Sequence, residues 1–319
     1  MFSEKYLVSI IMPAYNTSEF ISIAIDSVIK QTHTNWELII INDGSTDNTA
    51  EIINQYMHSN EKITLITIPN SGVCFARNLG FSKKSVESKF SFFFDSDDYI
   101  SPEFLEEILV VFESNKNIPA VYSNFEYIDA NNQLILNGYK NVNRRLTFFW
   151  FKEDSSNRLS SQNILFGSSI SEAFTVFKND LLEENPWNVK LKYAEGLLLF
   201  LKLINEHGKI FFLDKKIYFY RVRENQSQQI IPSIEKGKYI KEAINLFFSG
   251  LVNSARRKEF SNLRLCVEYR LKTKSTITSF LHNFKIEKFK TIINLLKVPF
   301  YYMKSFYYLM MLNFWKCRK

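Results

Sequence analysis

Three carboxylates crowd the stretch FFFDSDDYI, from Phe92 to Ile100. Asp95, Asp97 and Asp98 stand directly behind a run of aromatic residues that is typical of a buried strand. Like charges this close together raise one another's pKa unless a cation or a set of hydrogen-bond donors stabilises the anions. The stretch therefore predicts a positive group beside it, and a hard divalent cation held by one or two carboxylates is one such group.

Loops with similar polar residues follow four apolar runs, with the sequences PAYN, NDGSTD, PNSG and DSDD in chain order. Taken singly, Asp43-Gly44 and Asn70-Ser71-Gly72 are ordinary turn sequences, and Asp47 is an ordinary helix cap. Taken together they indicate a site, because ligands of parallel sheets bind beyond the carboxyl ends of the strands. We expect Asp43 and the carboxylate cluster to lie along one rim of a sheet.

The elements that must position these loops alternate between strand and helix as far as about residue 130. Alternating and continuous apolar patterns predict strands, and apolar residues at helical spacing predict helices. The predicted strands are 7–13, 36–43, 63–69, 89–95 and 120–129, and the predicted helices are 18–32, 46–57, 73–84 and 102–114. Strands separated by helices of this length predict a parallel sheet with right-handed crossovers.

The second half is less regular. The polar stretch 141–163 is expected to be a surface excursion, and residues 170–182 to hold a strand and the entry to a helix. Residues 194–208 form a predicted helix with a strong apolar face. Residues 209–228 read as a hairpin-like pair of strands whose end is rich in arginine.

The net charge of +7 is concentrated in the C-terminal tail. Between Lys285 and Lys319 eight basic residues accompany one acid, so this tail holds the whole excess, and aromatic and aliphatic residues separate its lysines. Pro299 and Lys304 interrupt the apolar run, which is shorter than the roughly 20 residues of a spanning helix. Residues 285–319 are therefore predicted to form an interfacial helix on an anionic membrane; the alternative is a packed C-terminal helix with a solvated basic face. Nucleic acid is not an expected partner, because a basic patch for it would not need so many apolar residues.

The remaining composition limits the class of protein. An apolar fraction of 46% is ordinary for a packed globular chain. The three cysteines form no CxxC pair, which argues against a disulfide framework or a zinc site. The first residues show neither a basic segment nor a long apolar run, so secretion is not expected. The expected location is cytoplasmic, peripheral on the inner face of the cell membrane.

Four stretches of the first half resemble the successive signatures of family 2 glycosyltransferases, namely VSIIMPAYN, WELIIINDGSTDNT, NSGVCFARNLG and FFFDSDDYISP. The family consists of inverting enzymes that use nucleotide-activated sugars. Its GT-A fold is an α/β fold with a mostly parallel central sheet, flanked by helices, and a Rossmann-like nucleotide-binding half. The resemblance covers roughly residues 6 to 225. It implies a GT-A domain at 1–230, followed by a helical, basic region at 231–319 that we expect to associate with a membrane.

The resemblance also implies roles for residues near the nucleotide. The backbone around Pro13, Tyr15 and Asn16 would line the nucleotide pocket, and Asp43 would hold the base or the ribose. Arg77 would lie near the donor phosphates or the acidic cluster.

Further roles concern the acidic motif and the end of the arginine-rich segment. Asp95 and Asp97 correspond to the family's DxD motif for Mg²⁺ or Mn²⁺, with Asp97 as the expected direct ligand and Asp95 also near the nucleotide sugar. Asp98 would brace the loop or contact the sugar. Arg221 and Arg223 are candidate phosphate contacts, the alternative being a solvated charged loop.

The pair Glu195-Gly196 departs from the family pattern. The resembling enzymes usually have Glu-Asp here, and the Asp is the expected base that removes the proton of the acceptor hydroxyl. Glycine has no side chain with which to reach that proton. Two hypotheses stay open: Glu195 is the catalytic base, or the chain has lost transfer activity and kept its donor site. The alternative for Glu195 is a purely structural role, in which this first-turn acid interacts only with the helix dipole.

The predicted activity is transfer of a sugar, with inversion, from a nucleotide sugar to a hydroxyl of a glycan or lipid-linked acceptor. A UDP-sugar is the favoured donor, and synthesis of a cell-surface polysaccharide or glycoconjugate is the expected setting. The alternatives are a catalytically impaired relative or partner subunit, and nucleotidyl transfer. Nucleotidyl transfer normally requires a glycine-rich phosphate loop and a basic residue after the first strand, and PAYNTSEF has neither.

Overall fold

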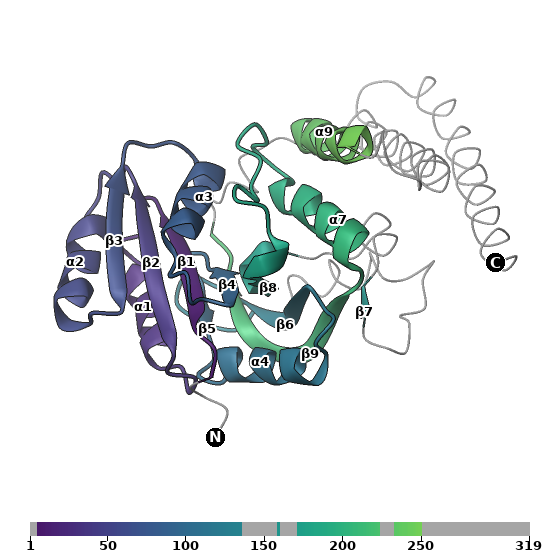
Figure 1. Ribbon diagram of the computed structural model, residues 1–319. Helices are drawn as coiled ribbons and strands as arrows, with labels where there is room; N and C mark the ends of the chain where they lie inside the picture. The colour runs from purple at the N-terminus through teal and green to yellow at the C-terminus, as the bar shows by residue number, and fades with distance from the viewer. Residues whose placement is uncertain (1–4, 136–157, 160–170, 224–232, 251–319) are drawn as a thin grey trace, which may run out of the picture. The chain divides into compact units, whose positions relative to one another are not determined.

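The structure is a computed structural model that describes residues 5–135, 158–159, 171–223 and 233–250 (Figure 1). The chain divides into two compact units, residues 1–226 and 227–319. The described part of the first unit is a mixed β-sheet covered by helices on both faces. In the second unit the described element is the helix α9 (Ser233–Gly250).

The strand-helix alternation predicted as far as residue 130 is confirmed. Its strands are β1 (Val8–Ala14), β2 (Trp36–Asp43), β3 (Ile63–Ile68), β4 (Phe90–Phe93) and β6 (Ala120–Ile128). Its helices are α1 (Ile21–Ile29), α2 (Thr49–Ser59), α3 (Val73–Lys83) and α4 (Phe104–Ser114). A two-residue strand, β5 (Tyr99–Ile100), follows the acidic loop and was not predicted.

The later part of the first unit completes the sheet. It contributes β7 (Arg158–Leu159), β8 (Thr175–Lys178), β9 (Ile210–Arg221), the helix α7 (Glu195–His207) and the short 3-10 turns η1 (Glu172–Phe174) and η2 (Asn179–Leu181). The strand order is β3-β2-β1-β4-β8-β6-β9-β5, with β7 paired to β9. The order β3-β2-β1-β4 is parallel throughout, as predicted, and β9 is parallel to β6. The strand β8 runs antiparallel to β4 and β6, so the sheet is mixed.

The hairpin-like pair predicted at 209–228 is wrong. Residues 210–221 form the one strand β9, whose pairing with β6 shifts register on both sides of Asn124. Asp214 and Lys215 lie between the pairs Ser123↔Leu213 and Asn124↔Lys216 as extra residues of β9, so the strand continues through this polar stretch without a turn. The side chain of Asn124 donates a hydrogen bond to Asp214 at 2.7 Å across this irregularity.

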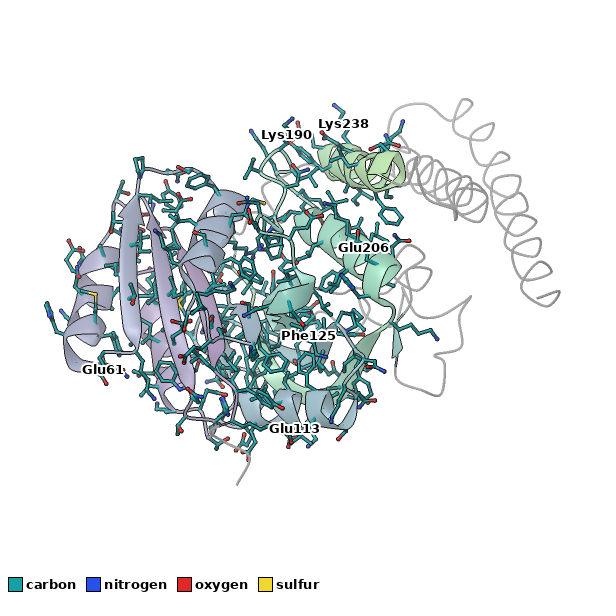
Figure 2. All side chains as sticks on the ribbon, in the orientation of Figure 1. Glu61, Glu113, Phe125, Lys190, Glu206 and Lys238 are labelled. Carbon is teal, nitrogen blue, oxygen red and sulfur yellow. The ribbon has the colours of Figure 1, made fainter. Side chains whose placement is uncertain are left out.

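Aromatic residues fill the core beneath the acidic loop. Phe92 and Phe104 lie 4.8 Å apart between ring centroids, and Phe93 meets Trp187 edge-on at 4.9 Å. Figure 2 shows side chains filling the space between sheet and helices, with Phe125 among them, where it stacks on Phe174. The run before the acidic residues is therefore the buried strand that the sequence predicted, and it fixes where the loop begins.

Gly80 sets how closely α3 lies on the sheet, and α3 carries Arg77. A Cβ at Gly80 would come within 2.5 Å of Ile11 Cγ2. Because overpacking of this kind forces the backbones apart, we expect Gly80→Ala to lower the free energy of unfolding by about 1–3 kcal/mol in urea denaturation. The control is Ser82→Ala on the exposed side of the same helix, where the change should stay within about 0.5 kcal/mol. Equal changes in both variants would contradict the close packing.

Candidate active site

The loops after β1 and β2 are tied together at the rim of the sheet. Asn16 has a φ of 50°, and its backbone N-H donates to Ser45 Oγ at 3.1 Å. Its side-chain Oδ1 accepts from the backbone N-H of Thr46 at 2.8 Å. Pro13 lies at the end of β1, and the side chain of Tyr15 is 49% exposed. In the segment expected at the nucleotide, hydrogen bonds at Asn16 hold the backbone, and the aromatic ring of Tyr15 is exposed to solvent.

Asp43 joins the loops after β2 and β3. The carboxylate is buried, and its two oxygens accept the backbone N-H groups of Ser71 at 2.6 Å and Gly72 at 2.9 Å. The adjacent Gly44 has a φ of 73°, and a Cβ there would meet the backbone nitrogen of Asn70 at 2.7 Å. Glycine is therefore required where the two loops meet. The described contacts of Asp43 organise this meeting point, and its role toward a base or ribose stays a prediction.

Arg77 is the centre of an acidic cluster. Its Nη2 donates to Asp95 at 2.9 Å, and its Nη1 donates to Glu172 at 3.0 Å and lies 3.9 Å from Glu195. The guanidinium is 3% exposed and lies 4.7 Å from the centre of the Trp187 ring. Burial alone would lower the pKa of Arg77, but the three carboxylate charges outweigh it and raise the pKa. Arg77 is therefore permanently charged, and its guanidinium is the shared positive partner of Asp95, Glu172 and Glu195.

The second positive group beside the acidic loop is Arg223. Its Nη2 lies 2.6 Å from Asp97 Oδ2. Burial raises the pKa of Asp97, the charge of Asp95 raises it further, and Arg223 opposes both effects. The positive charge that the crowded carboxylates require is thus present in the chain itself, as Arg77 and Arg223.

Asp98 braces the base of the loop, one of the two roles expected for it. It is buried, and it accepts the hydroxyl of Tyr218 at 2.5 Å and the backbone N-H of Arg221 at 2.7 Å. Burial and the charges of Asp97 and Asp95 raise the pKa of Asp98 well above its ordinary value. These two bonds attach the acidic loop to the end of β9.

Arg221 contacts the backbone rather than solvent. It is fully buried, and its Nε donates to the carbonyl of Asp97 at 2.6 Å. Its Nη1 donates to the carbonyl of Asp129, and its Nη2 to the side chain of Asn132. Arg221 therefore braces the loops after β4 and β6. Of the two arginines expected at the phosphates, Arg223 is the one that forms an ion pair with a carboxylate of the DxD motif.

The acidic motif suits a hard cation in its donor type. Among the described residues no three His, Cys, Asp or Glu side chains gather into a metal cage. Asp95 and Asp97 offer carboxylate oxygens and are 28% and 13% exposed. One or two carboxylates with phosphate oxygens and water are the usual surroundings of Mg²⁺, so the pair fits a cation that arrives with a diphosphate.

Sequence reasoning missed several residues of this site. Glu172 and Trp187 both contact Arg77 but are far from it in the chain and match no motif. Phe20 lies under both arginines of the β9 end, 4.7 Å from Arg221 and 5.3 Å from Arg223. No local pattern marks these residues, because their roles depend on contacts between distant segments.

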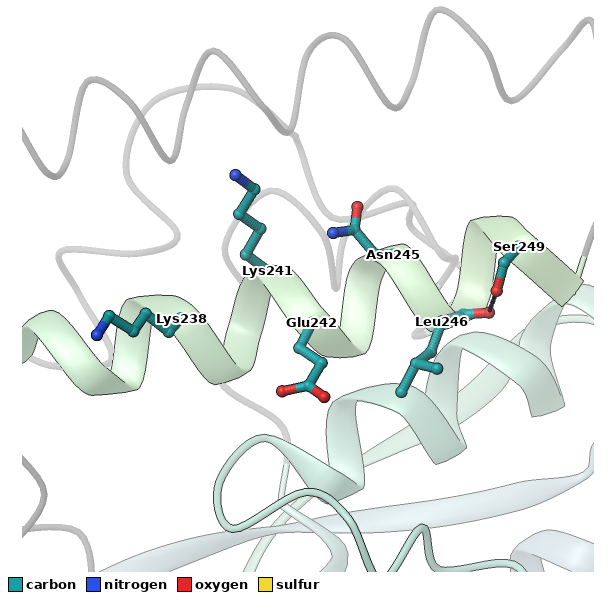
Figure 3. A pocket seen from close by; sticks show the side chains of 6 residues that line it. All are labelled: Lys238, Lys241, Glu242, Asn245, Leu246 and Ser249. Atoms are coloured by element: carbon teal, nitrogen blue, oxygen red, sulfur yellow. Dashed lines mark hydrogen bonds between the residues drawn. The ribbon is translucent and has the colours of Figure 1, made fainter.

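A hollow of about 380 Å³ lies along α9 in the second unit (Figure 3). Its lining residues are Lys238, Lys241, Glu242, Asn245, Leu246 and Ser249. None of these was expected in the donor site. Within the described part of the chain, every helix is too short or too polar to cross a membrane.

The sequence of this chain is similar to those of known proteins. The sequence profile of Glycosyl transferase family 2 matches residues 9–174. Chondroitin synthase of Pasteurella multocida is 33% identical over 214 residues, which are 66% of this chain and 20% of that protein. The chain thus matches about a fifth of the length of that curated relative.

Two further similarities bear on the fold and on chemistry. The UDP-Glc:alpha-D-GlcNAc-diphosphoundecaprenol beta-1,3-glucosyltransferase WfgD of Escherichia coli is 40% identical over 129 residues, 40% of this chain and 49% of that protein. The crystal structure of S. aureus TarS 1-349 in complex with UDP-GlcNAc is similar with a TM-score of 0.57 and 20% identity. That likeness covers 94% of this chain and 92% of the other, and it confirms the predicted fold.

Proposed function

This chain belongs to glycosyl transferase family 2, and on that premise we propose that it moves a sugar from a UDP-sugar to a hydroxyl of a glycan or lipid-linked acceptor, with inversion. The setting would be synthesis of a bacterial cell-surface polysaccharide or glycoconjugate. The similar proteins support the donor and acceptor classes, since one was crystallised with UDP-GlcNAc and another is named for transfer from UDP-Glc to a diphosphoundecaprenol-linked sugar.

The observation that carries the proposal is the meeting of Asp95 and Asp97 with Arg77 and Arg223 at the rim of the sheet. Carboxylates and guanidinium groups side by side suit a ligand that combines a cation with phosphates. The Nε of Arg223 is buried and, among the described residues, has no acceptor. A phosphate oxygen of the donor would supply one.

Each residue then has a task in the proposed reaction. Asp97 and Asp95 would hold Mg²⁺ or Mn²⁺, which stabilises the negative charge that builds on the leaving diphosphate. Arg223 would contact a phosphate with the same guanidinium that pairs with Asp97. The exposed ring of Tyr15 and the backbone of Pro13 and Asn16 would line the nucleotide pocket.

Inversion also requires a base on the acceptor side. The candidate from the sequence is Glu195, in the first turn of α7. Burial and the charge of Glu172 raise the pKa of Glu195, against the effect of Arg77, and a carboxylate with a raised pKa is a better proton acceptor. Glu172 lies at the same arginine as Glu195, so it is a second carboxylate to consider for this role.

The test of the function is a donor screen. The purified chain is incubated with Mn²⁺ and UDP-glucose, UDP-galactose, UDP-N-acetylglucosamine or UDP-N-acetylgalactosamine, and with a synthetic lipid diphosphate carrying N-acetylglucosamine. We expect release of UDP from one donor and a product larger by one sugar. A chain that binds UDP but transfers no sugar would instead be the impaired relative that Gly196 suggested, and a chain that does not bind UDP would overturn the proposal.

The membrane part of the proposal concerns residues 285–319, which lie outside the described residues. We keep a domain boundary near residue 230, a helical region at 231–319 and a cytoplasmic location at the inner membrane face as proposals from charge and aromatic content. The full chain is expected to sediment with vesicles that contain anionic lipid and to stay in solution with neutral ones. A chain truncated after residue 284 that sediments equally well would contradict the assignment.

A further inference from the structure

The space beside Gly196 is filled by a carboxylate from another part of the chain. A Cβ added at Gly196 would lie 2.2 Å from Glu172 Oε2 and 3.0 Å from its carboxyl carbon. Real Cβ atoms do not approach other atoms so closely, so a side chain at 196 and the present position of Glu172 exclude each other. Glycine at 196 is what lets the Glu172 carboxylate lie there.

The carboxylate at this place belongs to η1, just before β8, and not to α7. Its Oε1 accepts from Arg77 Nη1 at 3.0 Å, which fixes one oxygen. Its Oε2 is the atom directed at Gly196, in the first turn of α7. Arg77 and the helix N-terminus both favour a negative charge at this place, while the neighbouring carboxylate of Glu195 opposes it.

The same arginine connects Glu172 to the acidic motif. Arg77 Nη2 donates to Asp95 while Nη1 donates to Glu172, so the two carboxylates lie on the two ends of one guanidinium. The side chain of Glu172 is 16% exposed, so solvent reaches part of it. A carboxylate held in this way lies beside the donor motif with one oxygen not engaged by the arginine.

We propose that Glu172 is the general base of the sugar transfer, acting from the place that a side chain at 196 would occupy. The inference rests on the proposed function. Glu172 Oε2 takes the proton of the acceptor hydroxyl while the hydroxyl oxygen forms the new bond to the anomeric carbon of the donor sugar. The bond from that carbon to the diphosphate breaks, and the nucleoside diphosphate leaves with the electron pair. Glu195 is then a neighbouring charge at Arg77 and not the proton acceptor.

The first test asks whether residues 172 and 196 share one space, and it needs no activity. Melting temperatures are measured for Gly196→Asp in the wild-type chain and in the Glu172→Ala chain. We expect Gly196→Asp to lower the melting temperature more in the wild-type background than when residue 172 is alanine, because the displaced Glu172 loses its bond to Arg77 and gains a second carboxylate beside it. Equal shifts in both backgrounds would overturn the geometry on which the proposal stands.

The second test measures transfer with the donor and acceptor found in the screen. Glu172→Gln keeps the size of the side chain but removes the base, so kcat should fall by about 10²- to 10⁴-fold, with the affinity for UDP unchanged. Gly196→Ala should slow the reaction as well, because its methyl group displaces the carboxylate. The double variant Glu172→Ala, Gly196→Asp should regain at least tenfold over Glu172→Ala, since it returns a carboxylate to the same place. The control is Glu183→Gln, whose partner Lys202 lies on the surface, and it should transfer sugar at the wild-type rate.

The outcomes separate this inference from the proposed function. If the wild type transfers sugar and Glu172→Gln is equally fast, Glu172 is not the base. Loss of activity in Glu195→Gln but not in Glu172→Gln would assign the role to Glu195. A double variant that folds and binds UDP but stays as slow as Glu172→Ala would also overturn the inference. Failure of the wild type with every donor would reject the function, while the melting temperatures would still decide the geometry.

Discussion

Replacement of Arg77 by methionine is expected to lower the free energy of unfolding by about 3 kcal/mol or more. Methionine fills much of the same volume but leaves Asp95, Glu172 and Glu195 close together without their shared cation. Removal of the buried arginine leaves these charges without their counter-charge at a place that water reaches only in part. Urea denaturation followed by circular dichroism measures the change.

Two variants make this expectation specific. Arg77→Lys keeps the charge, but a single ammonium cannot reproduce the fork that reaches both Asp95 and Glu172, so an intermediate loss is expected. Lys202→Met removes an ion pair whose two side chains are 40% and 56% exposed. Exposed pairs contribute about 0–1 kcal/mol, so its effect should be small. If Arg77→Met were no more destabilising than Lys202→Met, the cluster would not be held together by this arginine.

Replacement of Asp97 by alanine is expected to remove the metal-dependent part of UDP binding. Because Asp97 would supply a ligand of the cation on the diphosphate, its removal should lower the affinity in Mn²⁺ by about a hundredfold, which corresponds to about 2.8 kcal/mol. The loop should remain folded, because Asp98 keeps its bonds to Tyr218 and Arg221. Calorimetric titration of UDP with Mn²⁺, and with a chelator in its place, gives both affinities.

The matched control is Asp180→Ala, an exposed carboxylate on η2. It should bind UDP as the wild type does, with and without metal. Wild-type binding of equal strength in Mn²⁺ and in chelator would contradict the metal assignment. Arg223 would then be the basic residue left to contact the diphosphate, because Arg77 is buried and paired with carboxylates.

The sequence by itself determined the alternation of strands and helices and the edge at which the acidic motif lies. These features follow from local patterns, because burial of a strand such as β2 needs a continuous apolar run and the carboxyl ends of parallel strands share one edge. It also determined that crowded carboxylates need a positive partner, since that depends only on their spacing.

Only the tertiary structure decided which groups meet at that edge. Arg77, Asp95 and Glu172 belong to segments separated by up to 95 positions, and no local pattern records such a contact. In the same way, the sequence shows only that residue 196 has no side chain. The structure shows that the carboxylate of Glu172 occupies the space that a side chain at 196 would take. The physical reason is that hydrophobic periodicity fixes each element separately, whereas pairing of buried charges depends on where the completed sheet brings distant side chains together.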